Sequence, residues 1–252
     1  MGKQVLAGEH GALFGCGCCV DGIHQTRAIS RLSRRRFLET GIAAVMAATT
    51  LGVTMPERAF AQSTLSPDAA LQALLEGNKR FVEKRLTSLD EDLSILKQNT
   101  AEKQEPFAAV LSCSDSRVPV ELAFDQSIGH VFVARVAGNV ATSEVIATLE
   151  YGALVLGTKA ILVLGHSDCG AIKAAIDGKP VPGQISALYA PLRPAIDAAG
   201  GKLDAAIQEN AKIQAKLLAE GSPALAGLIK DGKLKIAAGQ YDLASGKVSL
   251  LG

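Results

Sequence analysis

Two short clusters of polar side chains could perform chemistry, and each directly follows an apolar run. The first is Cys113–Arg117 (Cys-Ser-Asp-Ser-Arg) and the second is His166–Gly170 (His-Ser-Asp-Cys-Gly). Thiolate sulfur and neutral imidazole nitrogen are ligands that suit zinc. His166 and Cys169 are three residues apart, so a turn entering a helix directs both side chains to one side. With Cys113 they predict three zinc ligands and one open position, which is typical of catalytic zinc.

Asp115 and Arg117 lie beside this predicted metal site and carry opposite charges. Residues two apart on an extended stretch point the same way, so we expect a charge-assisted, bidentate pair. The pair would keep Asp115 ionised as a hydrogen-bond acceptor for zinc-bound water. If Arg117 released it, Asp115 could become a fourth zinc ligand and close the site. The alternative is a surface ion pair of little consequence.

Other interpretations of the candidate ligands stay open from the residues alone. Both cysteines could be small buried apolar residues, with His166 a loop histidine, or they could form a disulfide in an oxidising compartment. The remaining three of the five cysteines, Cys16, Cys18 and Cys19, lie far away near the N-terminus. They match no defined metal site, and the spacing does not indicate a disulfide framework.

The elements that must position these clusters predict an α/β fold with a central, mostly parallel sheet flanked by helices. Short continuous apolar runs, as at 107–111 and 160–165, are typical of buried parallel strands, and sites in such sheets lie beyond the carboxyl ends of the strands. An N-terminal helical arm is expected from a cap at Ser66 to about Arg85. Further strands are expected at 130–136, 234–239 and 248–251, and helices at 143–156, about 183–198 and 202–219. One domain, 62–252, accounts for all of them.

The first 61 residues have the features of an export signal. Arg34 and Arg35, followed by Phe37 and Leu38, resemble the twin-arginine motif, and a weakly apolar stretch and a small-x-small cleavage site at 59–61 follow. We expect residues 1–61 to be cleaved and the protein to be periplasmic or otherwise exported. An amphipathic helix of the folded domain is the alternative. No run reaches the roughly 18 apolar residues of a membrane span, so no stable membrane anchor is expected. The net charge of +1 gives no support for nucleic-acid binding.

Together the two clusters resemble the beta-class carbonic anhydrases, which are lyases. The likeness extends over most of 66–252, including Leu-Leu-Glu-Gly-Asn-Lys-Arg-Phe at 74–81 and Arg-Val-Ala-Gly-Asn at 135–139. The resemblance implies reversible hydration of carbon dioxide to bicarbonate and a proton by attack of zinc-bound hydroxide. It implies one zinc ion per subunit and the following site: Cys113, His166 and Cys169 as ligands, and Asp115 and Arg117 as the catalytic dyad.

The resemblance also implies a substrate pocket and an oligomeric state. One branch of the family has a Trp three residues before the first ligand, as part of an allosteric bicarbonate site, and Val110 occupies that position here. The other branch has a Gln, a Phe and a Tyr that Gln104, Phe132 and Tyr151 match, and Gly170 completes the expected pocket. In that branch these residues reach across a dimer interface, which implies a homodimer or a tetramer of dimers. From the residues alone, Phe132 and Tyr151 would be interpreted as core packing.

Two further functions are compatible with the same residues. Hydrolysis of carbon disulfide or carbonyl sulfide needs the same zinc hydroxide in a narrower pocket. A non-catalytic zinc-binding protein would instead use Asp115 as a permanent fourth ligand. Arg117 argues against that alternative, because a structural zinc site has no need to hold Asp115 off the metal.

Overall fold

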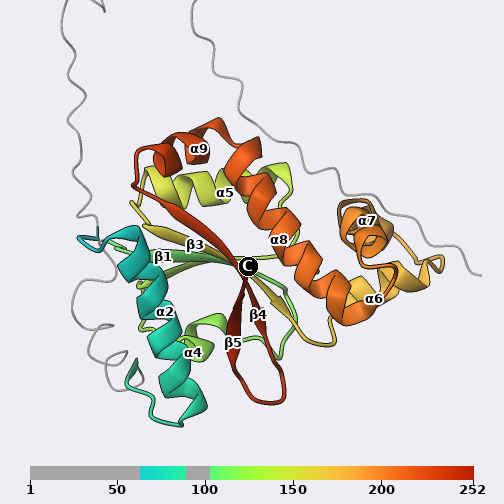
Figure 1. The fold of residues 1–252 in the computed structure, drawn as a ribbon, viewed down its shortest axis with the longest axis horizontal. Coiled ribbons are helices and arrows are strands. Elements are labelled where there is room, and N and C mark those ends of the chain that lie inside the picture. Colours follow the sequence, from blue (N-terminus) through green and yellow to red (C-terminus); the bar gives the residue numbers. More distant parts are fainter. Residues whose placement is uncertain (1–62, 89–102) are drawn as a thin grey trace, which may run out of the picture. The chain divides into compact units, whose positions relative to one another are not determined.

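A computed structural model describes residues 63–88 and 103–252 (Figure 1). The expected export signal, with Arg34, Arg35 and the three N-terminal cysteines, lies outside the described residues, as do residues 89–102. In chain order the described elements are α2 (Pro67–Val82), β1 (Ala108–Ser112), α4 (Val120–Ala123), β2 (Val131–Arg135), α5 (Ser143–Leu154), β3 (Ala160–His166), α6 (Gly170–Asp177), the 3-10 helix η1 (Ile185–Leu188), α7 (Tyr189–Ala198), α8 (Leu203–Gly221), α9 (Pro223–Lys230), β4 (Lys235–Tyr241) and β5 (Val248–Leu251).

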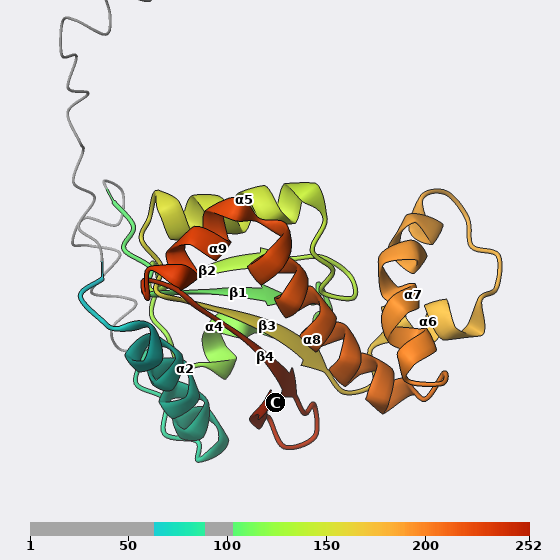
Figure 2. The same ribbon diagram turned by 45° about the horizontal axis from the view of Figure 1, so that its top comes forward.

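The five strands form one sheet in the order β2-β1-β3-β4-β5, in which β5 is antiparallel to β4 and the other pairs are parallel. β1 and β3 are buried along their whole length, as expected of strands covered on both faces. Alternate residues of β1 face opposite sides: Val110 packs with α2 and α4, whereas Leu111 packs with α5 and α8. Helices therefore cover both faces (Figures 1 and 2), and the predicted mostly parallel sheet flanked by helices is confirmed.

The N-terminal helix α2 is tied to the sheet by a buried amide. Ser66 caps the helix through a hydrogen bond from the backbone N–H of Ala69, and the helix ends at Val82, a few residues before the predicted end. Asn78 donates to the carbonyls of Ala123 (2.9 Å) and Gly246 (2.8 Å) and accepts from the N–H of Val248 (2.8 Å). Both polar atoms of the amide are thus satisfied.

Three short helices, α4, α6 and α9, were not predicted as elements. α6 begins directly after Cys169, and the sequence indicated only a turn entering a helix there. α9 has a signal that could have revealed it: Ser222 accepts from the N–H of Leu225, and Pro223 occupies the first turn. No helix in the described ranges is both long and apolar enough to cross a membrane. α6 and α7 lie beyond the carboxyl ends of β1 and β3 (Figure 2), which is the edge that holds the candidate ligands.

Candidate metal centre

Strand register brings the three candidate ligands to one edge of the sheet. Ser112 of β1 lies opposite Leu164 of β3, so Cys113 and His166 emerge from neighbouring strands at almost the same level. Cys169 occupies the N-cap position of α6, one short turn after β3. The three donor atoms lie within 4.8 Å of one another. All three residues are buried, with His166 fully enclosed.

The ring of His166 is oriented to leave one nitrogen available. Its Nδ1 lies 2.9 Å from the carbonyl oxygen of Ser167, and because that oxygen can only accept, Nδ1 must carry the proton. Nε2 then presents a lone pair, and it is buried without a hydrogen-bond partner in the described part of the chain. A buried polar atom without a partner is destabilising unless a metal or water satisfies it. A metal-binding histidine is held in this way through its other nitrogen.

The two thiols are close enough to share a proton, and both cysteines are free rather than joined in a disulfide. A hydrogen bond from the Cys169 thiol holds the pKa of Cys113 well below its ordinary value, and the N–H of Gly138 supports the same thiolate at 3.3 Å. The pKa of Cys169 is raised because that thiol keeps the shared proton beside a thiolate in a buried site. One thiolate and one thiol that would lose its proton on metal binding, next to a bare imidazole nitrogen, fit a zinc ion.

Asp115 and Arg117 form the predicted bidentate pair. Arg117 donates from Nε to Oδ1 of Asp115 (2.9 Å) and from Nη2 to Oδ2 (2.8 Å). The predicted reason was wrong, however: the segment is a turn and not an extended stretch. The backbone N–H of Arg117 also donates to Oδ1 at 2.9 Å, so Asp115 organises its own turn. The Arg117 hydrogen bonds hold the pKa of Asp115 well below its ordinary value.

Two arginines brace the ligand-bearing loops, and the sequence analysis assigned a role to only one of them. Arg117 reaches the second cluster by donating to the carbonyl of Asp168 at 3.3 Å. Arg135, at the carboxyl end of β2, donates to the carbonyls of Cys113 (2.9 Å) and Asp115 (2.6 Å). Arg135 ends the strand next to β1, and this position was the signal that could have indicated its role.

The structure does not bring the expected pocket residues together within one chain. Phe132 and Tyr151 are neighbours, with ring centroids 6.2 Å apart, but Phe132 lies opposite Ala109, four residues before Cys113, which is roughly 13 Å along the strand. Tyr151 is 47% exposed. Gln104 is exposed before the start of β1, and Gly170 is the exposed first residue of α6, directly beside Cys169.

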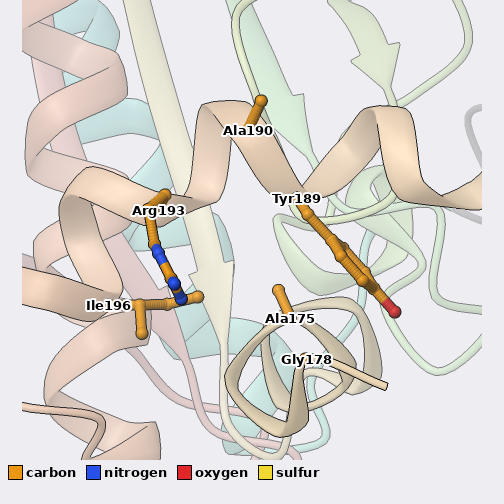
Figure 3. A pocket seen from close by; sticks show the side chains of 6 residues that line it. All are labelled: Ala175, Gly178, Tyr189, Ala190, Arg193 and Ile196. Atoms are coloured by element: carbon orange, nitrogen blue, oxygen red, sulfur yellow. The ribbon is translucent and has the colours of Figure 1, made fainter. Parts of the chain in front are cut away.

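A cavity of about 300 Å³ between α6 and α7 is separate from the candidate centre (Figure 3). Its walls come from both helices, and none of the three candidate ligands lines it. The side chains of Tyr189 and Arg193 extend from α7 on opposite sides of the cavity, with Ala175 of α6 between them. The cavity therefore adds nothing to the metal centre.

Comparison with known proteins gives a consistent result. The model of the carbonic anhydrase family matches residues 108–248, which include all three candidate ligands. The chain is 34% identical over 193 residues to carbonic anhydrase 2 of Mycobacterium tuberculosis, covering 73% of this chain and 93% of that one. Its fold resembles a Coccomyxa beta-carbonic anhydrase solved with acetazolamide, with a TM-score of 0.59, 27% identity, and coverage of 72% of this chain and 86% of that one. It also resembles a tetrameric beta-carbonic anhydrase from Sordaria macrospora, with a TM-score of 0.56, 26% identity, and coverage of 66% and 94%.

Proposed function

The chain belongs to the carbonic anhydrase family, in its beta class, and we propose that Cys113, His166 and Cys169 hold the zinc ion on which its activity depends. As a carbonic anhydrase it is a lyase that catalyses the reversible hydration of carbon dioxide to bicarbonate and a proton. The observation that carries the zinc assignment is the buried Nε2 of His166, which has no hydrogen-bond partner in the described ranges, on a residue whose ligand atom lies within 4.8 Å of two thiol sulfurs.

When bound there, zinc would supply a Lewis acid that makes water a strong nucleophile near neutral pH. The protein's own contribution begins with Asp115, whose Oδ2 lies 3.8 Å from Nε2 of His166 and so reaches the same space. Its lowered pKa keeps the carboxylate ionised at neutral pH. An ionised carboxylate accepts hydrogen bonds but donates none, so Asp115 orients the attacking water by accepting a hydrogen bond from it. Val140 and Ile172 belong to the same buried apolar cluster as the two cysteines, so the surroundings of the site are apolar.

Arg117 determines whether the site is open. It engages both oxygens of Asp115, so in this structure the carboxylate is held by hydrogen bonds from the guanidinium. Three ligands and a restrained carboxylate support a catalytic site more than a permanently filled, non-catalytic zinc site. Release of Asp115 by Arg117 would allow the carboxylate to occupy the fourth position and stop turnover.

We further propose that the active form is a homodimer or a tetramer of dimers. β2 is an edge strand, and Phe132 on it contacts Tyr151 of α5. Tyr151 and Leu154 expose about half of their surface on the same helix, at 47% and 49%. Exposed apolar side chains grouped beside a sheet edge are typical of an interaction surface. A second copy placed there would cover these residues and would allow Phe132, Tyr151 and Gln104 to reach the partner's site.

Export through the twin-arginine route is also part of the proposal, and it rests on the sequence of residues 1–61 alone. Arg34-Arg35, the weakly apolar stretch and the Ala59-Phe60-Ala61 site support it. A route that carries folded proteins would allow zinc to be bound before the two thiols meet an oxidising compartment.

The zinc assignment is tested by replacing His166 with Ala and measuring zinc stoichiometry by atomic absorption together with carbon dioxide hydration by stopped flow. We expect one zinc per wild-type chain, and a variant that stays folded but loses both zinc and activity. A folded His166→Ala variant that keeps stoichiometric zinc and full activity would show that the centre lies elsewhere.

A further inference from the structure

A short loop after β2 supplies a hydrogen bond to the first candidate ligand. The backbone N–H of Gly138 points at Sγ of Cys113 at a distance of 3.3 Å. Gly138 and Asn139 both have left-handed backbone conformations, with φ of 78° and 45°. Gly adopts this region freely and Asn tolerates it, so local preference permits the turn but does not by itself fix the direction of the Gly138 N–H. Something else must fix the direction of the Gly138 N–H.

Two buried amides on α8 fix this loop at both ends. Asn210 donates from Nδ2 to the carbonyl of Gly138 at 2.8 Å, and Gln214 accepts at Oε1 from the N–H of Ala141 at 2.9 Å. The amides are one helical turn apart and are joined to each other, since Gln214 donates to Oδ1 of Asn210 at 3.1 Å. Asn210 is fully buried and Gln214 is 2% exposed.

The packing around Gly138 leaves little room for a side chain at this position. A side chain at this position would meet the methyl carbons of Leu192 on α7 at 3.2 and 3.3 Å. Leu192 is itself fully buried in the cluster that contains Cys113 and Cys169. α7 therefore closes the loop from one side while the α8 amides hold its polar groups.

We propose that Asn210 and Gln214 are positioning residues for the metal-binding thiolate: they fix the 138–141 loop so that the Gly138 N–H supports Sγ of Cys113. They touch neither substrate nor metal and act only through the loop. An N–H donor aimed at a thiolate stabilises its negative charge and fixes the direction of the sulfur lone pairs, and partners of this kind tune metal affinity. The inference rests on the proposed zinc site.

The test compares Asn210→Leu with Asn78→Leu. Both residues are buried asparagines that donate to backbone carbonyls, but the hydrogen bonds of Asn78 join α2 to α4, to the turn before β5 and to β5, away from the ligand loops. Zinc affinity is measured on each folded full-length protein by competition with a chromophoric chelator. The thiolate-to-metal charge-transfer band of the cobalt(II)-substituted protein gives a second readout, which reports the sulfur directly and does not depend on activity.

We expect Asn210→Leu to weaken zinc binding roughly tenfold or more and to shift the cobalt band. Asn78→Leu should lower the melting temperature while leaving zinc affinity and the cobalt spectrum as in the wild type. Gln214→Leu, which removes the other half of the pair, provides a second variant with the same expectation if Asn210→Leu does not fold.

Wild-type zinc affinity and cobalt spectra in the folded Asn210→Leu or Gln214→Leu protein would overturn the inference, as would an equal effect of Asn78→Leu. These results are distinguishable from a failure of the proposed function. In that case the wild-type protein itself would bind no zinc at the Cys113–His166–Cys169 site.

Discussion

The guanidinium of Arg117 holds both oxygens of the Asp115 carboxylate, with Nε 2.9 Å from Oδ1 and Nη2 2.8 Å from Oδ2. The same carboxylate reaches within 3.8 Å of Nε2 of His166. Asp115 thus lies between an arginine that holds its carboxylate and the proposed metal centre, whose fourth ligand position the carboxylate could otherwise occupy. This relationship governs the predicted behaviour of the site.

Arg117→Ala should lower kcat/KM by about 100-fold at neutral pH, the scale expected when one preorganised group at a reacting centre is lost. The freed Asp115 carboxylate would then compete for the open metal position. Stopped-flow carbon dioxide hydration measures the change. Arg85→Ala is the matched control: Arg85 also pairs with an acidic residue two positions away, Glu83, but on the exposed end of α2. Equal activity in the Arg117 and Arg85 variants would contradict the gating role.

Asp115→Asn should reduce activity to a similar extent, because an amide NH₂ facing the nucleophile donates where the carboxylate accepted. Since Arg117 acts through Asp115, the double variant Asp115→Asn, Arg117→Ala should be little worse than Asp115→Asn alone. Steady-state rates of the four proteins form a double-mutant cycle. Strictly additive losses would mean that Arg117 contributes independently of Asp115.

Zinc binding should release protons and become tighter as pH rises. Burial alone would lower the pKa of His166, but the adjacent Cys113 thiolate raises it overall, and the Cys169 pKa is also raised. The Cys169 thiol therefore keeps its proton at neutral pH in the metal-free site, and zinc must displace it, which contributes up to about tenfold in affinity per pH unit. Calorimetric titration in buffers of different ionisation enthalpy measures the release. Buffer-independent heats at pH 7 would disagree with this protonation state.

A buried carboxylate away from the metal centre should make stability depend on pH. Burial would raise the pKa of Asp125, but Arg80, the backbone N–H groups of Thr87 and Ser88 and the Thr87 hydroxyl outweigh it and hold this pKa well below 3.8. The group therefore contributes stability above the unfolded-state pKa of about 3.9, and loses it as pH falls through the folded-state pKa.

Asp125→Asn isolates that contribution, because the backbone φ of 47° at this position is one that Asn also tolerates. It should lower the free energy of unfolding by about 3 kcal/mol at pH 7, since it leaves Arg80 without its partner. Urea denaturation at pH 7 and pH 3 measures the difference between variant and wild type, which should shrink at the lower pH. A difference that is constant with pH would exclude the ion pair as its source.

Replacing Arg34 and Arg35 with Lys should leave the uncleaved precursor in the cytoplasm if the chain uses the twin-arginine route. Cell fractionation with an antibody to the folded domain measures the distribution. The matched control replaces Arg27 and Arg31 with Lys, because these two arginines precede the motif. Both pairs of substitutions leave the net charge unchanged. Unchanged export of the Arg34, Arg35 variant would refute the route.

The ligand set and the sheet could be predicted because both depend on local patterns. Continuous apolar runs identified β1 and β3, and parallel pairing necessarily placed Cys113 and His166 at the same edge. The Asp115–Arg117 pair was predicted correctly, but from an extended backbone that the segment does not have. Both an extended stretch and the observed Asx turn bring these two side chains together.

The supporting residues could not be predicted, because their roles depend on tertiary contacts. Asn210 lies in a helix 72 residues after Gly138, and no local pattern marks it as a partner of that carbonyl. For Arg135 the sequence offers only its position at the end of the strand next to β1, because the backbone carbonyls that it binds carry no residue-specific signal. Gln104, Phe132 and Tyr151 were assigned by resemblance to a site that one chain does not assemble, so their role depends on a second copy.

The most direct test of the proposed function is stopped-flow carbon dioxide hydration by the purified, zinc-loaded protein at pH 7 and pH 8.5. With Asp115 held by Arg117 as in this structure, the protein should be active at both pH values, and removal of zinc with a chelator should abolish the activity until zinc is restored. Zinc-loaded protein without hydration activity at either pH would contradict the proposal.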